Sequence, residues 1–108
     1  MSKVAKRYEI YLPVRYNDGT EIEPEKFERV ERELVERFGG VTSVQRQFPL
    51  RGVWKGEKQT YLDLVVIFTV IDLSGADVGE FFTSYKEKLK SSFRQEEVLI
   101  TVHELMVL

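Results

Sequence analysis

Apolar and polar residues alternate along residues 5–16, and this period of two predicts a strand with one buried face. One phase of the alternation is apolar and consists of Tyr8, Ile10, Leu12 and Val14. The other phase is mixed and consists of Arg7, Glu9, Tyr11 and Arg15. The sequence Asn-Asp-Gly-Thr at 17–20 is typical of a turn, so this strand is expected to end there.

The period changes to a helical one over residues 23–40. Pro24 suits the first helical position, and Gly39 suits the left-handed residue that follows a helix. One apolar stripe is formed by Phe27, Val30, Leu34 and Phe38. Opposite charges spaced four residues apart, each pair contributing roughly 0.2–0.5 kcal/mol, are Glu25 with Arg29, Glu28 with Arg32, and Glu33 with Arg37.

Residues 41–54 predict a second, less regular strand, because Arg46 interrupts its apolar phase. Pro49 cannot donate to a strand ladder, which indicates an edge position or a bulge. Residues 60–71 predict a third strand with apolar side chains on both faces, which is typical of a central strand. One of its phases contains Leu62, Leu64, Val66, Phe68 and Val70, and the other Tyr61, Asp63, Val65, Ile67 and Thr69.

A second helix is predicted to open within residues 72–77, where Ser74 and Asp77 resemble a capping box. Its apolar stripe contains Val78, Phe81, Phe82, Tyr85, Leu89 and Phe93. Residues 96–108 predict a last strand, whose odd phase (Leu99, Thr101, His103) suits an open face and whose even phase suits the core, unless a bulge near Glu104 reverses them.

The predicted order is β-α-β-β-α-β, which indicates an α+β fold of the ferredoxin-like type. Such a plait is a four-stranded antiparallel sheet with both helices on one face. Right-handed crossovers place the first and third strands at the centre and the other two at the edges. With 108 residues and no linker-like segment, we expect one domain over residues 1–108.

Two short motifs connect this chain to known sequences: Phe-Gly-Gly-Val-Thr at 38–42 and Gly-Val-Trp at 52–54. With the order of elements, they make the chain resemble small, uncharacterised bacterial ferredoxin-like families with a Phe-Gly-Gly-x-Thr turn and a Gly-x-Trp before the third strand. The resemblance implies the same fold and self-association. It implies no catalytic residues.

Composition narrows the functional classes. With 16 basic and 18 acidic side chains the net charge is −2, which argues against a general nucleic-acid binder. Tyr11 and Tyr61 invite comparison with RNA-recognition plaits, but the glycine–aromatic motif of those plaits is missing. The longest apolar run, 64–68, is too short to cross a bilayer, and the N-terminus does not resemble a signal peptide. We therefore expect a cytoplasmic protein without a membrane partner.

The sheet face that the helices leave open is expected to be mixed in character. Its candidate ligand or interface residues are Tyr11, Trp54, Tyr61, Arg7, Arg15, Val65 and Ile67. Because a solvated face rarely combines Val, Ile and Tyr, we expect a homo-oligomer, with a face-to-face dimer forming an α+β barrel as the simplest form. Coverage by loops or by the second strand is the alternative.

Three residues are weak candidates for catalysis, each with a plainer interpretation. His103, the single histidine, suits a general base, but an edge-strand histidine often has no role. Glu9 and Asp63 are expected on one face of neighbouring strands, where paired carboxylates can share a proton or simply pair with arginines.

Trp54 is either an aromatic wall of a site or a packing residue at the base of a hairpin.

No cofactor or metal is expected, since the chain has no cysteine and one histidine.

Two hypotheses about the function remain. The first is an oligomeric module that binds a small molecule or a protein on its open face. The second is a cofactor-free α+β-barrel enzyme, such as a small oxygenase or isomerase, with His103, Glu9 or Asp63 as base and Arg7 or Arg15 holding an anion.

Overall fold

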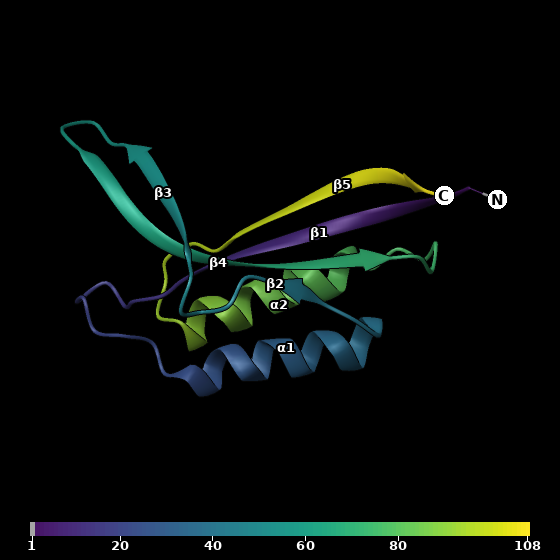
Figure 1. The fold of residues 1–108 in the computed structure, drawn as a ribbon, viewed down its shortest axis with the longest axis horizontal. Helices are drawn as coiled ribbons and strands as arrows, with labels where there is room; N and C mark the ends of the chain where they lie inside the picture. The colour runs from purple at the N-terminus through teal and green to yellow at the C-terminus, as the bar shows by residue number, and fades with distance from the viewer. Residues whose placement is uncertain (1) are drawn as a thin grey trace.

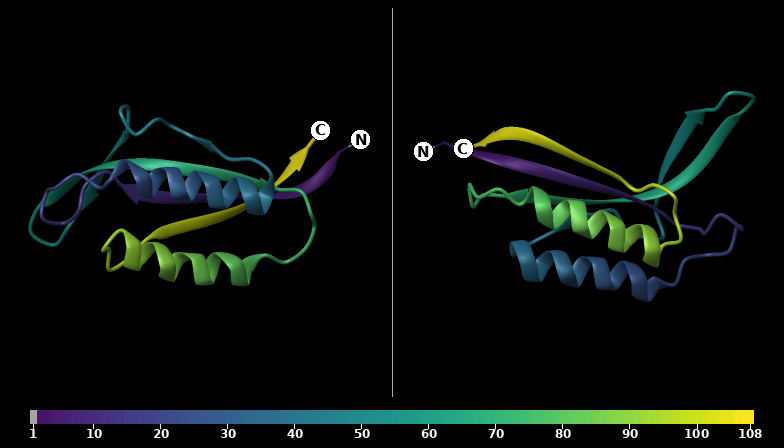
Figure 2. Two further views of the ribbon diagram at one scale, coloured as in Figure 1. Left: turned by 90° about the horizontal axis from the view of Figure 1, so that it is seen from below. Right: turned by 180° about the vertical axis from the view of Figure 1, so that it is seen from behind.

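The computed structural model describes residues 2–108, which form one antiparallel sheet covered on one face by two helices. The strands are β1 (Lys3–Pro13), β2 (Thr42–Ser43), β3 (Leu50–Lys55), β4 (Thr60–Asp72) and β5 (Leu99–Val107), and the helices are α1 (Pro24–Phe38) and α2 (Gly79–Ser92). Figures 1 and 2 show the two layers, with both helices side by side beneath the sheet. The predicted ferredoxin-like α+β fold is confirmed.

The strand order agrees with the predicted topology. β4 and β1 are central, β5 pairs with the outer side of β1, and β2 and β3 both pair with the outer side of β4. The predicted second strand is thus on an edge, and it is broken into two pieces. Phe48 N–H donates to the carbonyl of Gln45 in a turn between the pieces, and Pro49 has no N–H to continue a ladder.

Helix α1 begins and ends where its sequence signals predict. Pro24 is its first residue, and Gly39 adopts a left-handed φ of 85° while its N–H donates to the carbonyl of Val35. Helix α2 corrects the sequence analysis, because it begins only at Gly79 and has no side-chain cap. Ser74 and Asp77 accept hydrogen bonds from Ala76 and Gly79 in the preceding turns instead of forming a capping box.

The core lies between the sheet and the helices and follows the predicted phases, except that Val102, in the even phase of β5, is 57% exposed. Ile10 and Leu12 of β1, Leu34 of α1, Val66 of β4 and Phe93 after α2 are all at most 1% exposed. Aromatic rings fill the centre, where Tyr8 stacks on Phe82 with ring centroids 3.9 Å apart. The β5 register runs unbroken past Glu104, so its odd residues lie on the open face as predicted.

The β3–β4 hairpin extends beyond the two-layer body. β1 pairs with β4 only from Val65 onward, so residues 60–64 pair with β3, and their one backbone link toward β1 is the Val14 N–H, which donates to the carbonyl of Leu64 over 3.0 Å. Figure 1 shows the hairpin bending up, away from the helices. Leu62 and Leu64 share the phase of the core residues but are 62% and 38% exposed, because no helix lies beneath them. Sharing the core phase therefore does not bury a side chain at this end of β4.

Candidate ligand-binding hollow

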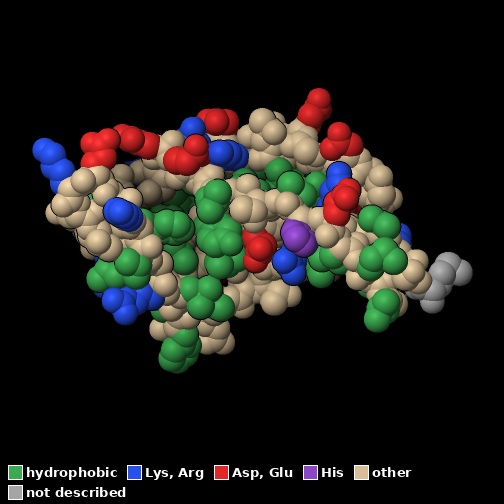
Figure 3. All heavy atoms as spheres, turned by 90° about the horizontal axis from the view of Figure 1, so that it is seen from above, with side chains coloured by type: hydrophobic (Ala, Val, Ile, Leu, Met, Phe, Trp, Pro, Cys, Tyr) green, Lys and Arg blue, Asp and Glu red, His purple; other side chains and the backbone are tan. Residues whose placement is uncertain are grey.

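The raised hairpin encloses a hollow on the open face of the sheet, with a volume of about 870 Å³. Its walls are the hairpin, the end of β1 with the following turn, and the start of β5. Six residues that the sequence analysis singled out line it together: Tyr11, Arg15, Trp54, Tyr61, Asp63 and Val65. Figure 3 shows this face, with hydrophobic side chains gathered over the end away from the chain termini.

Two glycines of the hairpin hold its aromatic rings in place. Trp54 faces Tyr61 across the β3–β4 ladder. A Cβ at Gly52 would lie 3.1 Å from Nε1 of Trp54, so the indole lies back over the Gly52 backbone. A Cβ at Gly56 would lie 2.5 Å from the Tyr61 ring. The Gly-x-Trp motif therefore has a packing reason, since a side chain at position 52 would crowd the indole.

The polar groups of the hollow are unevenly paired. Neither Asp63 nor Arg15 forms an ion pair within residues 2–108. Glu97, in contrast, pairs with Lys86 over 2.8 Å and accepts a hydrogen bond from the N–H of Val98. The hydrogen bond from Lys86 and then that from Val98 lower the pKa of the Glu97 carboxyl. One free carboxylate and one free guanidinium thus remain to meet a ligand.

The wall after β1 is fixed from below by a cluster around Tyr16. The Tyr16 hydroxyl donates to Glu23, and Lys26 donates to the Tyr16 hydroxyl over 2.6 Å and to the carbonyl of Ser92. The hydrogen bond from Tyr16 is the main reason that the pKa of Glu23 is lowered. Arg94 also lies over the Tyr16 ring, 4.7 Å from its centroid. These contacts tie the first loop to both helices.

The remaining predicted site residues lie elsewhere on the open face. Arg7, Glu9, Ile67 and His103 do not line the hollow. Arg7 faces His103 across the β1–β5 ladder, and its guanidinium lies 3.9 Å from the Glu9 carboxylate. Its Nε atom is buried without a hydrogen-bond partner. Figure 3 shows the histidine among charged side chains near the middle of the face.

The face therefore divides into a polar middle and an aromatic end. Of the three candidate bases, Asp63 is the one that lines the hollow. Other residues that no sequence pattern indicated also line the hollow, among them Tyr16, Asn17, Gln95 and Glu97. Their place follows from the turns after β1 and before β5, and no periodic pattern identifies turn residues as neighbours in space.

Two features are absent from the described residues. Within residues 2–108, no helix is long and apolar enough to cross a membrane. The same residues contain no group of three or more His, Asp or Glu side chains arranged to hold a metal ion.

Comparisons with known proteins show the fold. No family model matches the chain, and no curated protein matches it. Among solved structures, a phage SAM lyase in complex with S-methyl-5'-thioadenosine is similar with a TM-score of 0.66 and 18% identity, covering 95% of this chain and 88% of that one. A phage SAM lyase in its apo state gives a TM-score of 0.56 and 24% identity, covering 95% of this chain and 81% of that one.

A second kind of protein shares the arrangement. The divalent cation tolerance protein CutA1 from Thermus thermophilus is similar with a TM-score of 0.59 and 16% identity, covering 92% of this chain and 82% of that one. These identities are low, so the similarities establish a shared arrangement of helices and strands.

Proposed function

We propose that this protein is a small-molecule-binding module whose hollow takes a flat, nucleoside-like ligand. The observation that carries the proposal is that Tyr11, Trp54 and Tyr61 border one hollow of about 870 Å³. This volume falls in the range of small-molecule sites, roughly 300–1,000 Å³. Aromatic rings provide stacking surfaces for bases whatever their hydrogen-bonding pattern.

The polar groups fit the rest of such a ligand. Asp63 faces the same side of the hairpin as Tyr61 and has no cation partner in the described chain. A free carboxylate accepts hydrogen bonds from sugar hydroxyls or from an amino group. The structurally similar phage lyase binds S-methyl-5'-thioadenosine, a nucleoside, and this supports the same ligand class here.

We also infer that copies of the chain associate through the hairpin and the open face. Apolar side chains are exposed on both sides of the hairpin: Trp54 (48%) and Tyr61 (51%) on one side, Val53 (56%) and Leu62 (62%) on the other. Large apolar side chains that are exposed at neighbouring positions are typical of interaction surfaces. Analytical ultracentrifugation of the full chain tests this, and a monomer at high micromolar concentration would contradict it.

The ligand test uses the single tryptophan, because excitation at wavelengths that the five tyrosines do not absorb makes the fluorescence report on Trp54 alone. We expect saturable quenching or a spectral shift with S-methyl-5'-thioadenosine and with adenosine. Tyr61→Ala should weaken binding about tenfold or more, since stacking on one aromatic ring contributes roughly 1–3 kcal/mol per base. Asp63→Asn should weaken the binding of both nucleosides and have a smaller effect on the binding of free adenine.

Phe48→Ala is the matched control, because Phe48 is 73% exposed and does not line the hollow. Equal loss of affinity in Phe48→Ala and Tyr61→Ala would contradict the site, as would the absence of any response at millimolar nucleoside. Chromatography of the nucleoside after long incubation distinguishes binding from turnover. Conversion that disappears in Asp63→Asn would favour the enzyme hypothesis over the binding module.

A further inference from the structure

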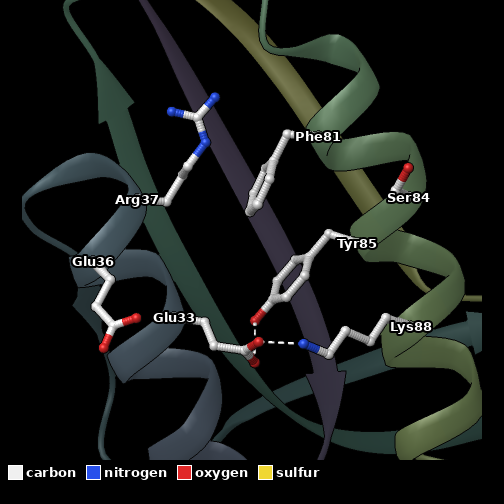
Figure 4. A pocket seen from close by; sticks show the side chains of 7 residues that line it. All are labelled: Glu33, Glu36, Arg37, Phe81, Ser84, Tyr85 and Lys88. Carbon is white, nitrogen blue, oxygen red and sulfur yellow. Dashed lines mark hydrogen bonds and ion pairs between the residues drawn. The ribbon is translucent and has the colours of Figure 1, made fainter.

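The other layer of the molecule carries a second concave site, a groove between α1 and α2 with a volume of about 440 Å³. Figure 4 shows Arg37 and Glu33 of α1 facing Phe81, Tyr85 and Lys88 of α2 across it. The rings of Phe81 and Tyr85 are stacked, with centroids 5.2 Å apart and planes 18° apart. The groove therefore has an aromatic wall between charged ends, on the face opposite the hollow.

At one end of the groove the charges are already matched. Glu33 pairs with Lys88, and it accepts a hydrogen bond from the Tyr85 hydroxyl over 3.4 Å. Burial, and then the charge of Glu33, raise the pKa of the Tyr85 hydroxyl well above its ordinary value, so it stays protonated and can donate even in alkaline solution. This end needs no further partner.

At the other end Arg37 has no matching charge. The sequence pairs it with Glu33 four residues earlier, but Glu33 turns to Lys88 instead. Arg37 forms no ion pair within residues 2–108, and the neighbouring Glu36 carboxylate points away from it in Figure 4. Its guanidinium lies 5.4 Å from the ring centroids of both Phe38 and Phe81. The two rings orient the guanidinium and leave its hydrogen-bond donors free.

We propose that this groove binds small aromatic carboxylic acids, with the carboxylate on Arg37 and the ring against Phe81 and Tyr85. A guanidinium binds a carboxylate through two parallel hydrogen bonds, and its stacking on rings keeps it in place for that contact. The aromatic wall adds apolar contact area for a flat ring, and most of it comes from the partly buried Phe81, because Tyr85 is only 3% exposed. A neutral analogue would keep the ring contact but lose the charge-assisted hydrogen bonds.

The test compares phenylacetate with phenylacetamide, its neutral analogue, by NMR titration of the isotopically labelled full chain. We expect saturable shifts at residues 37, 81 and 85 with phenylacetate, and affinity for the amide weaker by about tenfold or more. Arg37→Gln should remove this preference for the acid. Phe81→Leu should weaken both probes, because it removes the shared ring contact.

Arg32→Gln is the matched control, since it removes the same charge from an exposed position on the same helix that does not line the groove. Tyr61→Ala, in the hollow, should leave phenylacetate binding unchanged, which separates this site from the proposed nucleoside site. Circular dichroism checks that each variant is folded. Equal affinity for acid and amide, equal losses in Arg32→Gln and Arg37→Gln, or no saturable shift at about 10 mM phenylacetate would each overturn the proposal.

Discussion

Strand β4 has two halves that share one alternation and differ in what covers them. Over residues 66–70 its inward side chains lie on the helices, and Val66, Phe68 and Val70 are at most 3% exposed. Over residues 60–64 the same phase continues with Leu62 and Leu64, yet these side chains are exposed. The alternation determines which side chains share a face, whereas the length of the neighbouring elements determines whether that face is buried.

The first prediction compares the two halves directly by large-to-small substitution. Phe68→Ala should reduce the free energy of unfolding by about 3–5 kcal/mol, because it leaves a cavity under the sheet. Leu62→Ala should change it by less than about 1 kcal/mol, because the side chain is exposed in the single chain. Urea denaturation at low protein concentration measures both.

Equal losses of stability in Leu62→Ala and Phe68→Ala would contradict the difference between the two halves of β4. In that case a partner copy covers the hairpin in solution, and the loss should shrink as the protein is diluted. A loss that does not depend on concentration would instead contradict the exposed position of Leu62.

The second prediction concerns the glycine that follows helix α1. Gly39→Ala should cost about 1–2 kcal/mol, because its φ of 85° is left-handed and disfavours a Cβ. Gly40→Ala is the control, since Gly40 does not have a positive φ and a Cβ there meets nothing within 4 Å. Thermal unfolding of the two variants should therefore separate them, and similar melting temperatures would contradict the cap.

The third prediction uses the hydroxyl of Tyr85 on the helical side. Its pKa is raised in the folded chain, so the folded state retains a proton that the unfolded state releases above pH of about 10. This contribution to stability is complete below that pH and is lost as the pH rises further. Tyr85→Phe should lose less stability between about pH 9 and pH 11 than the wild type.

At neutral pH the same variant should be destabilised by only about 0.5–1.5 kcal/mol, the usual contribution of one hydrogen bond. Tyr61→Phe is its control, because Tyr61 is 51% exposed and forms no hydrogen bond with Glu33. Parallel pH profiles for wild type and Tyr85→Phe would contradict the raised pKa.

The smallest effect on stability is expected in the hairpin. Gly52→Ala should change the free energy of unfolding by less than about 0.5 kcal/mol, since its strand is exposed. It should nevertheless shift the Trp54 emission, because the added Cβ would lie 3.1 Å from the indole nitrogen. An unchanged spectrum would contradict the position of the ring over Gly52.

Much of the fold was predictable because local signals and global topology agree. Pro24 and Gly39 mark the ends of α1, and the strand phases identify the face of β1 and β5 that meets the helices. Pro49 indicated an edge strand, and the strand pairs with one neighbour only. Each of these signals acts within a few residues, so sequence alone was sufficient to read it.

The site was predictable only in part, because it depends on where separate elements end. Tyr11, Trp54, Tyr61 and Asp63 were selected as open-face residues, and the bend of the hairpin brings them into one hollow. The same reasoning grouped His103 with them, although it lies several residues farther along the sheet. The predicted pairing of Glu33 with Arg37 was also wrong, because the spacing of charges within α1 gives no information about Lys88 on α2.

The antiparallel pairing of Lys3 with Val107 would allow the elements of this sheet to be connected in a different order along the chain. Directly opposed residues in such a ladder lie about 5 Å apart, so a short added turn would join Val107 to Lys3. New ends could then be opened in the turn at residues 56–59, giving a circular permutant with the same sheet. Figure 1 shows that this turn lies at the far end of the sheet from the outer ends of β1 and β5, so the permutant would carry its new ends beside the hollow.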